Sequence, residues 1–470
     1  MNIKLLCRVL PFVLSFLTFH SIQGQNIIRG PYLQSVYQDH ITVRWRTDES
    51  TSSKVWYGTS PSSLNNVITS SSQATDHEVL LEDLIPDTKY YYAVGNNSGQ
   101  LANGQEHYFE TAPLPNSQEK IRMWLLGDMG FGNNNQRSVR DAFYDFNQNE
   151  PIDLILTVGD NAYQDGTDEE FQDGWFENMY EDQLINTPVF LTYGNHDAKS
   201  ADGEDGTGVY FDIFNLPANG ECGGYPSGNE SYYSHNYANI HFISVNSWDV
   251  EHTPDSPMIQ WLEDDLADNE MDWTIVMIHH PFYDGQKDNL SDTRYRNTKL
   301  RENMVPLFDQ YEVDLVLMGH SHTYQRSYLI DGHYEKSNTF DPNDMGIDMG
   351  DGQLDGDGAY KKVNGKGIPY VICGTAGYAL DNEDLNHPIM YHNELTKGSG
   401  YLELNYDQLD FKYITSDGII SDYFTIQKDL EFTVYNCAGL NTNFGVNCDD
   451  NNPYTYQDTI TTSCECEGTP

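Results

Sequence analysis

Five apolar runs between residues 119 and 322 each end in side chains that commonly bind metals. The runs read IRMWLLGD, IDLILTVGD, PVFLTYGNHD, WTIVMIHH and VDLVLMGHSH. Nearly continuous apolar runs are typical of strands buried on both faces, and the stretches between them carry apolar residues at helical spacing. Alternating strands and helices predict an α/β layered domain. Because sites in open α/β sheets form at the carboxyl ends of the strands, we expect these side chains to meet in one crevice.

The side chains at the ends of these runs are carboxylates, imidazoles, an amide and a phenol. They are Asp128, Asp160, Tyr163, Asn195, His196, Asp197, His279, His280, His320 and His322. A single Asp or His after a strand is usually a cap or a solvated loop residue, but here the pattern occurs five times. This donor set, without a thiolate, suits hard or borderline cations. Its size exceeds one coordination sphere, which indicates two ions, and Asp160 is a natural candidate to bridge them.

The first part of the chain differs from the rest. Residues 26–112 alternate between apolar and polar side chains in short runs such as HITVRWRT, TKYYYAVG and HYFETA, separated by Ser, Asn, Gly and Pro. This pattern predicts an all-β sandwich. The polar, proline-containing stretch APLPNSQEK marks the boundary with the α/β domain.

The motifs resemble those of a known family. GDMG, GDNAY, GNHD, VMIH and GHSHTYQR are similar to the five blocks of the purple acid phosphatases, within the calcineurin-like metallophosphoesterases. The resemblance covers about residues 119–428, and residues 26–112 resemble the fibronectin type III-like module common at the N-terminus of these enzymes. It implies a four-layer α/β/β/α sandwich preceded by an all-β domain.

The resemblance also implies a ligand set for each of two ions. One ion would be held by Asp128, Asp160, Tyr163 and His322, and the other by Asp160, Asn195, His279 and His320. The Tyr163 phenolate favours Fe(III), and the second ion is Fe, Zn or Mn.

Catalytic and substrate-binding roles follow from the same resemblance. Asn195 and His196 are expected to contact the substrate. His196 is expected either to hydrogen-bond the phosphoryl group or to protonate the leaving oxygen, with Asp197 orienting its ring. Many relatives carry histidines in the loop after the fourth block. This chain reads PFYDGQKDNLSDTRYR there, so Lys287 and Arg294 are the expected phosphate contacts.

The predicted function is that of a secreted acid phosphatase with two metal ions, which hydrolyses phosphomonoesters by in-line attack of a metal-bound hydroxide. The alternative is a phosphodiesterase or nucleotide hydrolase using the same site. A more distant alternative is a non-catalytic surface-binding protein that depends on calcium. It rests on the Asp- and Gly-rich stretch 340–360, where the candidate Ca²⁺ ligands are Asp348, Asp351, Asp355 and Asp357.

The composition and the two ends of the chain limit which partners the protein can bind and in which compartment it is expected. With 25 Lys and Arg against 72 Asp and Glu, the net charge of −47 argues against binding nucleic acids through their phosphates and against anionic membranes. Residues 1–24 form a signal peptide pattern, which predicts an extracellular, periplasmic or cell-surface location without a membrane span. The tail 429–470 holds Cys437, Cys448, Cys464 and Cys466, whose clustering favours disulfides. Nothing in the sequence indicates an oligomeric state.

Overall fold

A computed structural model of the chain describes residues 25–430 except 116, 118, 149, 288–290 and 363, together with 456–460 and 466–469. The predicted signal peptide and most of the tail lie outside these residues. Within the tail, β25 (Tyr456–Ile460) and β26 (Cys466–Thr469) pair as antiparallel strands. Cys466 is disulfide-bonded, in agreement with the disulfides expected there. Among the described residues, no helix has the length and apolar character needed to cross a bilayer.

The N-terminal part is an all-β domain, as predicted. Its strands are β1 (Ile27–Gln34), β2 (Ile41–Gly58), β3 (Asn66–Leu81), β4 (Lys89–Asn96), β5 (Gly99–Ala102) and β6 (Tyr108–Glu110), and every pairing is antiparallel. The long strand β2 pairs with β1 through its first half and with β4 through its second half. The strands therefore bury a common core, in which Trp45, Tyr92 and Phe109 are almost fully buried.

The larger domain contains two seven-stranded mixed sheets. The first sheet has the order β19 (Tyr360–Lys362), β24 (Ile420–Lys428), β23 (Gln408–Thr415), β22 (Gly398–Asn405), β7 (Ile121–Leu126), β8 (Leu154–Thr157) and β9 (Val189–Phe190). The second has the order β12 (Tyr233–Tyr237), β13 (Ile240–Val245), β14 (Trp273–Ile278), β15 (Leu315–Met318), β20 (Tyr370–Cys373), β16 (Tyr324–Ser327) and β21 (Met390–Glu394). Strands β7, β8 and β9 are parallel, as are β13, β14, β15 and β20.

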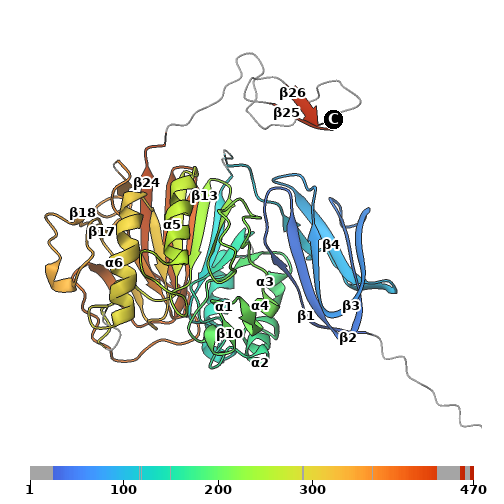
Figure 1. Cartoon of the computed structure of the whole chain (residues 1–470), viewed down its shortest axis with the longest axis horizontal. Helices are drawn as coiled ribbons and strands as arrows, with labels where there is room; N and C mark the ends of the chain where they lie inside the picture. Colours follow the sequence, from blue (N-terminus) through green and yellow to red (C-terminus); the bar gives the residue numbers. More distant parts are fainter. Residues whose placement is uncertain are drawn as a thin grey trace, which may run out of the picture.

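Alternate residues of the strands face different layers of this domain. On β14, Ile275 and Met277 join the core shared with the first sheet. Val276 and Ile278 belong to a second core, which also contains residues of α5 (Pro257–Asp268) and α6 (Tyr295–Gln310). On the first sheet, the β7 residue Trp124 stacks on Phe143 of α1 (Asn134–Asn147), with ring centroids 4.1 Å apart. Two sheets between helices make the predicted α/β/β/α sandwich, and α5 and α6 lie side by side on one face of it (Figure 1).

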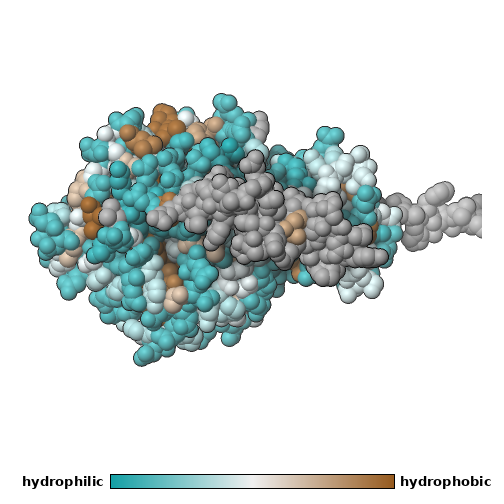
Figure 2. Space-filling model, turned by 90° about the horizontal axis from the view of Figure 1, so that it is seen from above, coloured by the Kyte–Doolittle hydropathy of each residue, from teal (hydrophilic) through white to brown (hydrophobic). Residues whose placement is uncertain are grey.

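Shorter elements complete the domain. They are α2 (Asp168–Phe171), η1 (Gln172–Phe176), α3 (Glu181–Leu184), η2 (Asp197–Lys199), β10 (Ala201–Asp202), β11 (Thr207–Gly208), α4 (Val209–Ile213), β17 (Leu329–Ile330), η3 (Ser337–Thr339) and β18 (Gly346–Asp348). The face seen in Figure 2 is largely hydrophilic where it is coloured, with small and separate hydrophobic patches, as the high content of acidic residues leads one to expect.

The β domain packs against the segment that carries α2 to α4 (Figure 1). Arg29 is almost fully buried, and its Nη1 lies 3.0 Å from Oδ1 of Asp168. Arg46 Nη1 lies 2.7 Å from Oδ2 of the same carboxylate. The Tyr32 hydroxyl donates a hydrogen bond to the Ile213 carbonyl oxygen at 2.6 Å. Asp168 is therefore the main acidic partner of two arginines from the other domain.

Replacing this carboxylate should weaken the domain interface. We expect Asp168→Asn to lower the free energy of unfolding by about 1–2 kcal/mol, because charged hydrogen bonds are lost while Arg29 stays buried. The effect is no larger because Asp168 is partly exposed, and solvent screens its attraction to the two arginines. Chemical denaturation measures the change. Asp165→Asn in the same segment is the control, since Asp165 is exposed and its ion pair with Lys199 spans 3.3 Å. An equal effect of both substitutions would contradict the role of Asp168.

Candidate metal centre

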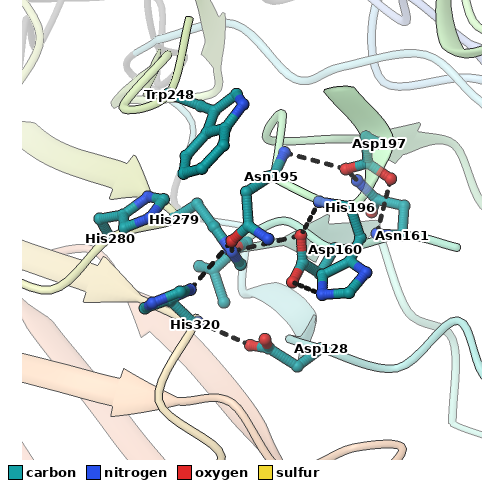
Figure 3. A network of polar contacts seen from close by, with 12 residues as sticks. Asp128, Asp160, Asn161, Asn195, His196, Asp197, Trp248, His279, His280 and His320 are labelled. Atoms are coloured by element: carbon teal, nitrogen blue, oxygen red, sulfur yellow. Dashed lines mark hydrogen bonds and ion pairs between the residues drawn. The ribbon is translucent and has the colours of Figure 1, made fainter. Parts of the chain in front are cut away.

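The predicted site residues lie at the carboxyl ends of strands from both sheets. Asp128, Asp160 and Asn195 follow β7, β8 and β9, which are parallel neighbours in the first sheet. His279 and His320 follow β14 and β15, which are parallel neighbours in the second sheet. The two sheets thus deliver their loop tips to the same edge of the sandwich (Figure 3).

The loop tips approach one another so closely that glycine is required before several of these residues. A Cβ atom on Gly194 would lie 2.1 Å from the backbone nitrogen of Asp160, and one on Gly159 would lie 2.4 Å from Nδ1 of His279. Asp128, Asp160 and His320 have φ angles of 53°, 53° and 65°, in the left-handed region that few non-glycine residues adopt. Such backbone strain is concentrated at functional sites.

One set of donor atoms surrounds the hydroxyl group of Tyr163. Its oxygen lies 2.9 Å from Oδ1 of Asp128, 2.8 Å from Oδ2 of Asp160 and 3.1 Å from Nε2 of His322. A phenol has a single proton, so it cannot satisfy two carboxylates and an imidazole at once. The surplus of electron pairs makes this position suitable for a cation.

A second set of donor atoms surrounds the amide oxygen of Asn195. It lies 2.9 Å from Nδ1 of His320 and 3.1 Å from Nε2 of His279. His279 Nε2 is also 3.3 Å from Oδ1 of Asp160, and Nδ1 donates to the Val158 carbonyl oxygen at 2.8 Å. The two oxygens of Asp160 therefore face different donor sets, Oδ2 the first and Oδ1 the second.

The electric field at this cluster attracts positive charge. Burial opposes ionisation of Asp160, but His279 and the backbone N–H of His196 outweigh it, and the pKa lies below its ordinary value. Burial likewise lowers the pKa of His279, but the charge of Asp160 more than offsets this and raises the pKa to about 9. Burial, with the charges of Asp128 and Asp160, raises the pKa of the Tyr163 phenol well above its usual range. Only a strongly positive ion would keep this phenol ionised at neutral pH.

His196 lies at the edge of the cluster, with 21% of its side chain exposed. Its Nε2 is 3.9 Å from Oδ2 of Asp160, and its ring lies 4.3 Å from that of Tyr163. Its Nδ1 donates to the carbonyl oxygen of Gln164 at 2.6 Å. The peptide carbonyl at Gln164 therefore fixes the ring and leaves Nε2 facing the cluster.

The expectation that Asp197 orients the His196 ring is wrong. The Asp197 carboxylate is fully buried and turned away, and it accepts hydrogen bonds from the backbone N–H and the side chain of Asn161 and from the backbone N–H of Gly194. Burial, with the negative charge of Asp160, raises its pKa to about 7. Asp197 thus joins two loop tips to each other and does not contact His196 through its carboxylate.

The loop that holds Gln164 is in turn fixed by α2. The Glu170 carboxylate accepts the backbone N–H groups of Gln164, Asp165 and Thr167. Thr167 caps the helix that begins at Asp168, the residue bound by the two arginines of the β domain. A continuous series of contacts therefore links the β domain to His196.

The two cations predicted to bind phosphate remain predictions. Lys287 and Arg294 are both exposed, and Arg294 is the residue that precedes α6. The contacts of the described residues connect a different cation, Arg296, to the cluster, because it lies over Trp248, which stacks on His280. Trp248 follows β13, another parallel strand of the second sheet. Sequence reasoning missed it because this strand ends in Asn-Ser-Trp rather than in Asp or His.

The predicted calcium ligands do not form a cluster. In the described part of the chain, the groups of three or more potential ligands combine Asp128, Asp160 and His279, or His279, His280 and His320. Asp351 Oδ1 instead accepts the backbone N–H groups of Gln353 and Asp357, both at 2.9 Å. The Asp- and Gly-rich stretch closes on its own backbone, and its geometry gives no support to a calcium site.

Two family models match the chain. The model for calcineurin-like phosphoesterases matches residues 121–324, and the model for the N-terminal domain of purple acid phosphatases matches residues 29–111. Together they span more than half of the sequence. The chain belongs to the purple acid phosphatase family. The family resemblance inferred from the motifs is confirmed.

Relatives extend the match beyond the motifs. Purple acid phosphatase 23 of Arabidopsis thaliana is 27% identical over 303 residues, which make up 59% of this chain and 62% of that protein. A phosphoenolpyruvate phosphatase of Allium cepa is 28% identical over 337 residues, 66% of this chain and 64% of that protein. The chain thus matches slightly less than two thirds of either relative. A purple acid phosphatase from yellow lupin (Lupinus luteus) seeds shares the fold, with a TM-score of 0.65 at 19% identity, covering 86% of this chain and 75% of that structure.

Proposed function

We propose that this protein is a phosphatase that uses two metal ions to hydrolyse phosphomonoesters. The observation that carries the proposal is the position of Asp160, whose two carboxylate oxygens face separate donor sets. A bridging carboxylate is the feature expected of a pair of ions that share one site. Membership of the family supports the same function.

The donor atoms fit two different ions. Asp128, Tyr163 and His322 would hold one ion with Asp160, and the phenolate would favour Fe(III) there. Asn195, His279 and His320 would hold the second ion with Asp160, and imidazole with amide oxygen suits Fe, Zn or Mn. When bound, the two cations would neutralise charge on the phosphoryl oxygens and lower the pKa of water, so that hydroxide is available to attack phosphorus in line.

The chain's own residues orient the substrate and move a proton. His196 would donate from Nε2 to the oxygen of the leaving alcohol, since Gln164 fixes Nδ1 and leaves Nε2 toward the cluster. Asn195, whose amide oxygen faces His279 and His320, is the expected neighbour of the phosphoryl group (Figure 3). Export from the cell remains part of the proposal, because it rests on the pattern of residues 1–24.

Turnover of two substrates tests the function. We expect the metal-loaded protein to hydrolyse p-nitrophenyl phosphate and to act much more slowly on bis-p-nitrophenyl phosphate. Faster turnover of the diester would instead support the phosphodiesterase alternative.

Substitution of Asp160 tests the bridging carboxylate. Asp160→Ala should reduce the content of both metals together and lower kcat by at least ~100-fold, because the bridge is lost. Full retention of one ion in Asp160→Ala would contradict bridging.

The visible spectrum tests the iron assignment. A tyrosinate bound to Fe(III) absorbs in the visible, so the purified protein should be coloured and Tyr163→Phe should lose the band. Tyr193→Phe is the control, because the Tyr193 hydroxyl binds Asp249 at 3.3 Å and lies outside the donor sets. Survival of the band in Tyr163→Phe would show that the iron assignment is wrong.

Substitution of His196 tests the proton donor. We expect His196→Ala to keep both metals and to lower kcat by about 100-fold, the usual contribution of general acid catalysis. His252→Ala serves as control, since the ring of His252 binds the Asn246 carbonyl oxygen at 2.9 Å. Unchanged kcat in His196→Ala, with metal content intact, would remove His196 from the mechanism.

A further inference from the structure

A ladder of aromatic rings leads from the donor cluster to the surface. The ring of His280 stacks on that of His320, with centroids 4.1 Å apart and planes at 29°. The indole of Trp248 stacks on the same His280 ring, with centroids 5.5 Å apart and planes at 12°. In Figure 3 the indole of Trp248 lies beside the ring of His280. The indole therefore forms one wall of the site next to the proposed metal ligands.

Trp248 is held firmly in this position. The guanidinium carbon of Arg296 lies 4.3 Å from the centroid of the indole, and Arg296 Nη1 donates to the carbonyl oxygens of Ser247 and Trp248. The Trp248 backbone N–H donates to Oδ1 of Asn246 at 2.8 Å. The Ser247 hydroxyl binds Nδ1 of His280 at 2.8 Å, which fixes the base of the ladder. Such an arrangement is rigid before any ligand binds, which reduces the entropy lost on binding.

The residue Trp248 is nevertheless 37% exposed. A side chain that served only the core would be buried, as Trp124, Trp175 and Trp273 are. A fixed, partly exposed aromatic wall with a few polar groups beside it is typical of a small-molecule site. Arg296 also places a positive charge at this wall, where the net charge of −47 otherwise disfavours an anionic substrate.

We propose that Trp248, positioned by Arg296, binds the leaving group and selects phosphoesters whose organic part carries a flat aromatic ring close to the phosphate. The inference rests on the proposed phosphatase function and specifies its substrate class. A phosphoryl group at the donor cluster would place a ring attached close to it against the indole. Two stacked aromatic rings gain more interaction free energy than burial of their apolar area alone provides. Saturated groups of equal size lack this attraction.

Two substrates with matched chemistry test the proposal. Benzyl phosphate and cyclohexylmethyl phosphate release alcohols of similar acidity and size, and only the first carries a flat ring. We expect wild-type kcat/KM to favour benzyl phosphate, and Trp248→Ala to lower kcat/KM for benzyl phosphate by about 3- to 10-fold with little change for cyclohexylmethyl phosphate. Trp248→Phe should retain most of the preference, since phenylalanine also offers a flat face.

A matched control separates this effect from loss of an indole in general. Trp56 of β2 also carries a cation, Lys54, at 4.8 Å from its ring centroid, but it lies in the β domain. Trp56→Ala should leave the ratio of the two kcat/KM values unchanged. An equal loss for both substrates in Trp248→Ala, or no loss for either, would overturn the proposal.

Binding without turnover distinguishes this inference from the proposed function. Titration calorimetry of the metal-loaded protein with benzylphosphonate and cyclohexylmethylphosphonate measures the ring preference directly, because phosphonates are not hydrolysed. If the protein hydrolyses neither phosphate, the phosphatase function fails. A benzylphosphonate preference that disappears in Trp248→Ala would still support the ring site, and equal affinities in the wild type would refute it.

Discussion

Carboxyl groups are costly to bury unless hydrogen-bond donors or cations compensate them. Three of them, Asp128, Asp160 and Asp197, are almost fully buried within one cluster. Asp128 and Asp160 accept the backbone N–H groups of His320 and His196, and Asp197 accepts that of Asn161, so each carboxylate binds the backbone of another loop tip. The loop tips must approach closely to supply these donors, which explains the glycines and left-handed residues at the strand ends. Asp128 and Asp160 also face the imidazoles and the phenol, so their remaining charge is available to bind cations.

The four-layer sandwich provides the rigidity that such a cluster needs. Neither sheet could form the site alone, because β7, β8 and β9 supply the carboxylates and the amide while β14 and β15 supply the imidazoles. The shared core between the sheets, with Met123, Ile275 and Met277 among its fully buried members, fixes the distance between the two sets of strand ends. Close packing of this kind resists the small shifts that would separate the candidate metal ligands.

The sequence predicts much of this site because the ligands follow apolar runs whose pattern identifies buried strands. The prediction that Asp128, Asp160 and His279 lie together requires only the rule that sites form at the carboxyl ends of parallel strands, and it does not depend on the conformation of the loops. Asp197 was predicted wrongly, because a neighbour in sequence was expected to contact His196 while the actual partner is a carbonyl from a separate loop. Trp248 and Arg296 escaped prediction for a similar reason, since their contact joins segments nearly fifty residues apart. Periodicity and motif spacing carry no information about contacts of this kind. The bonds of Asp351 to its own loop were equally hidden, because a string of acidic residues reads the same whether its oxygens face solvent, a cation or the backbone.

The contacts of Asp168 have a consequence for how this architecture changes over evolutionary time. Arg29 and Arg46 bind the residue that begins α2, Glu170 of the same helix fixes Gln164, and Gln164 orients His196. The two modules are therefore not interchangeable parts joined by a linker. A gene fusion that exchanged the β module for a foreign one would leave the helix without its arginine partners, so we expect a lineage that keeps His196, the proposed proton donor, in place to inherit both modules together.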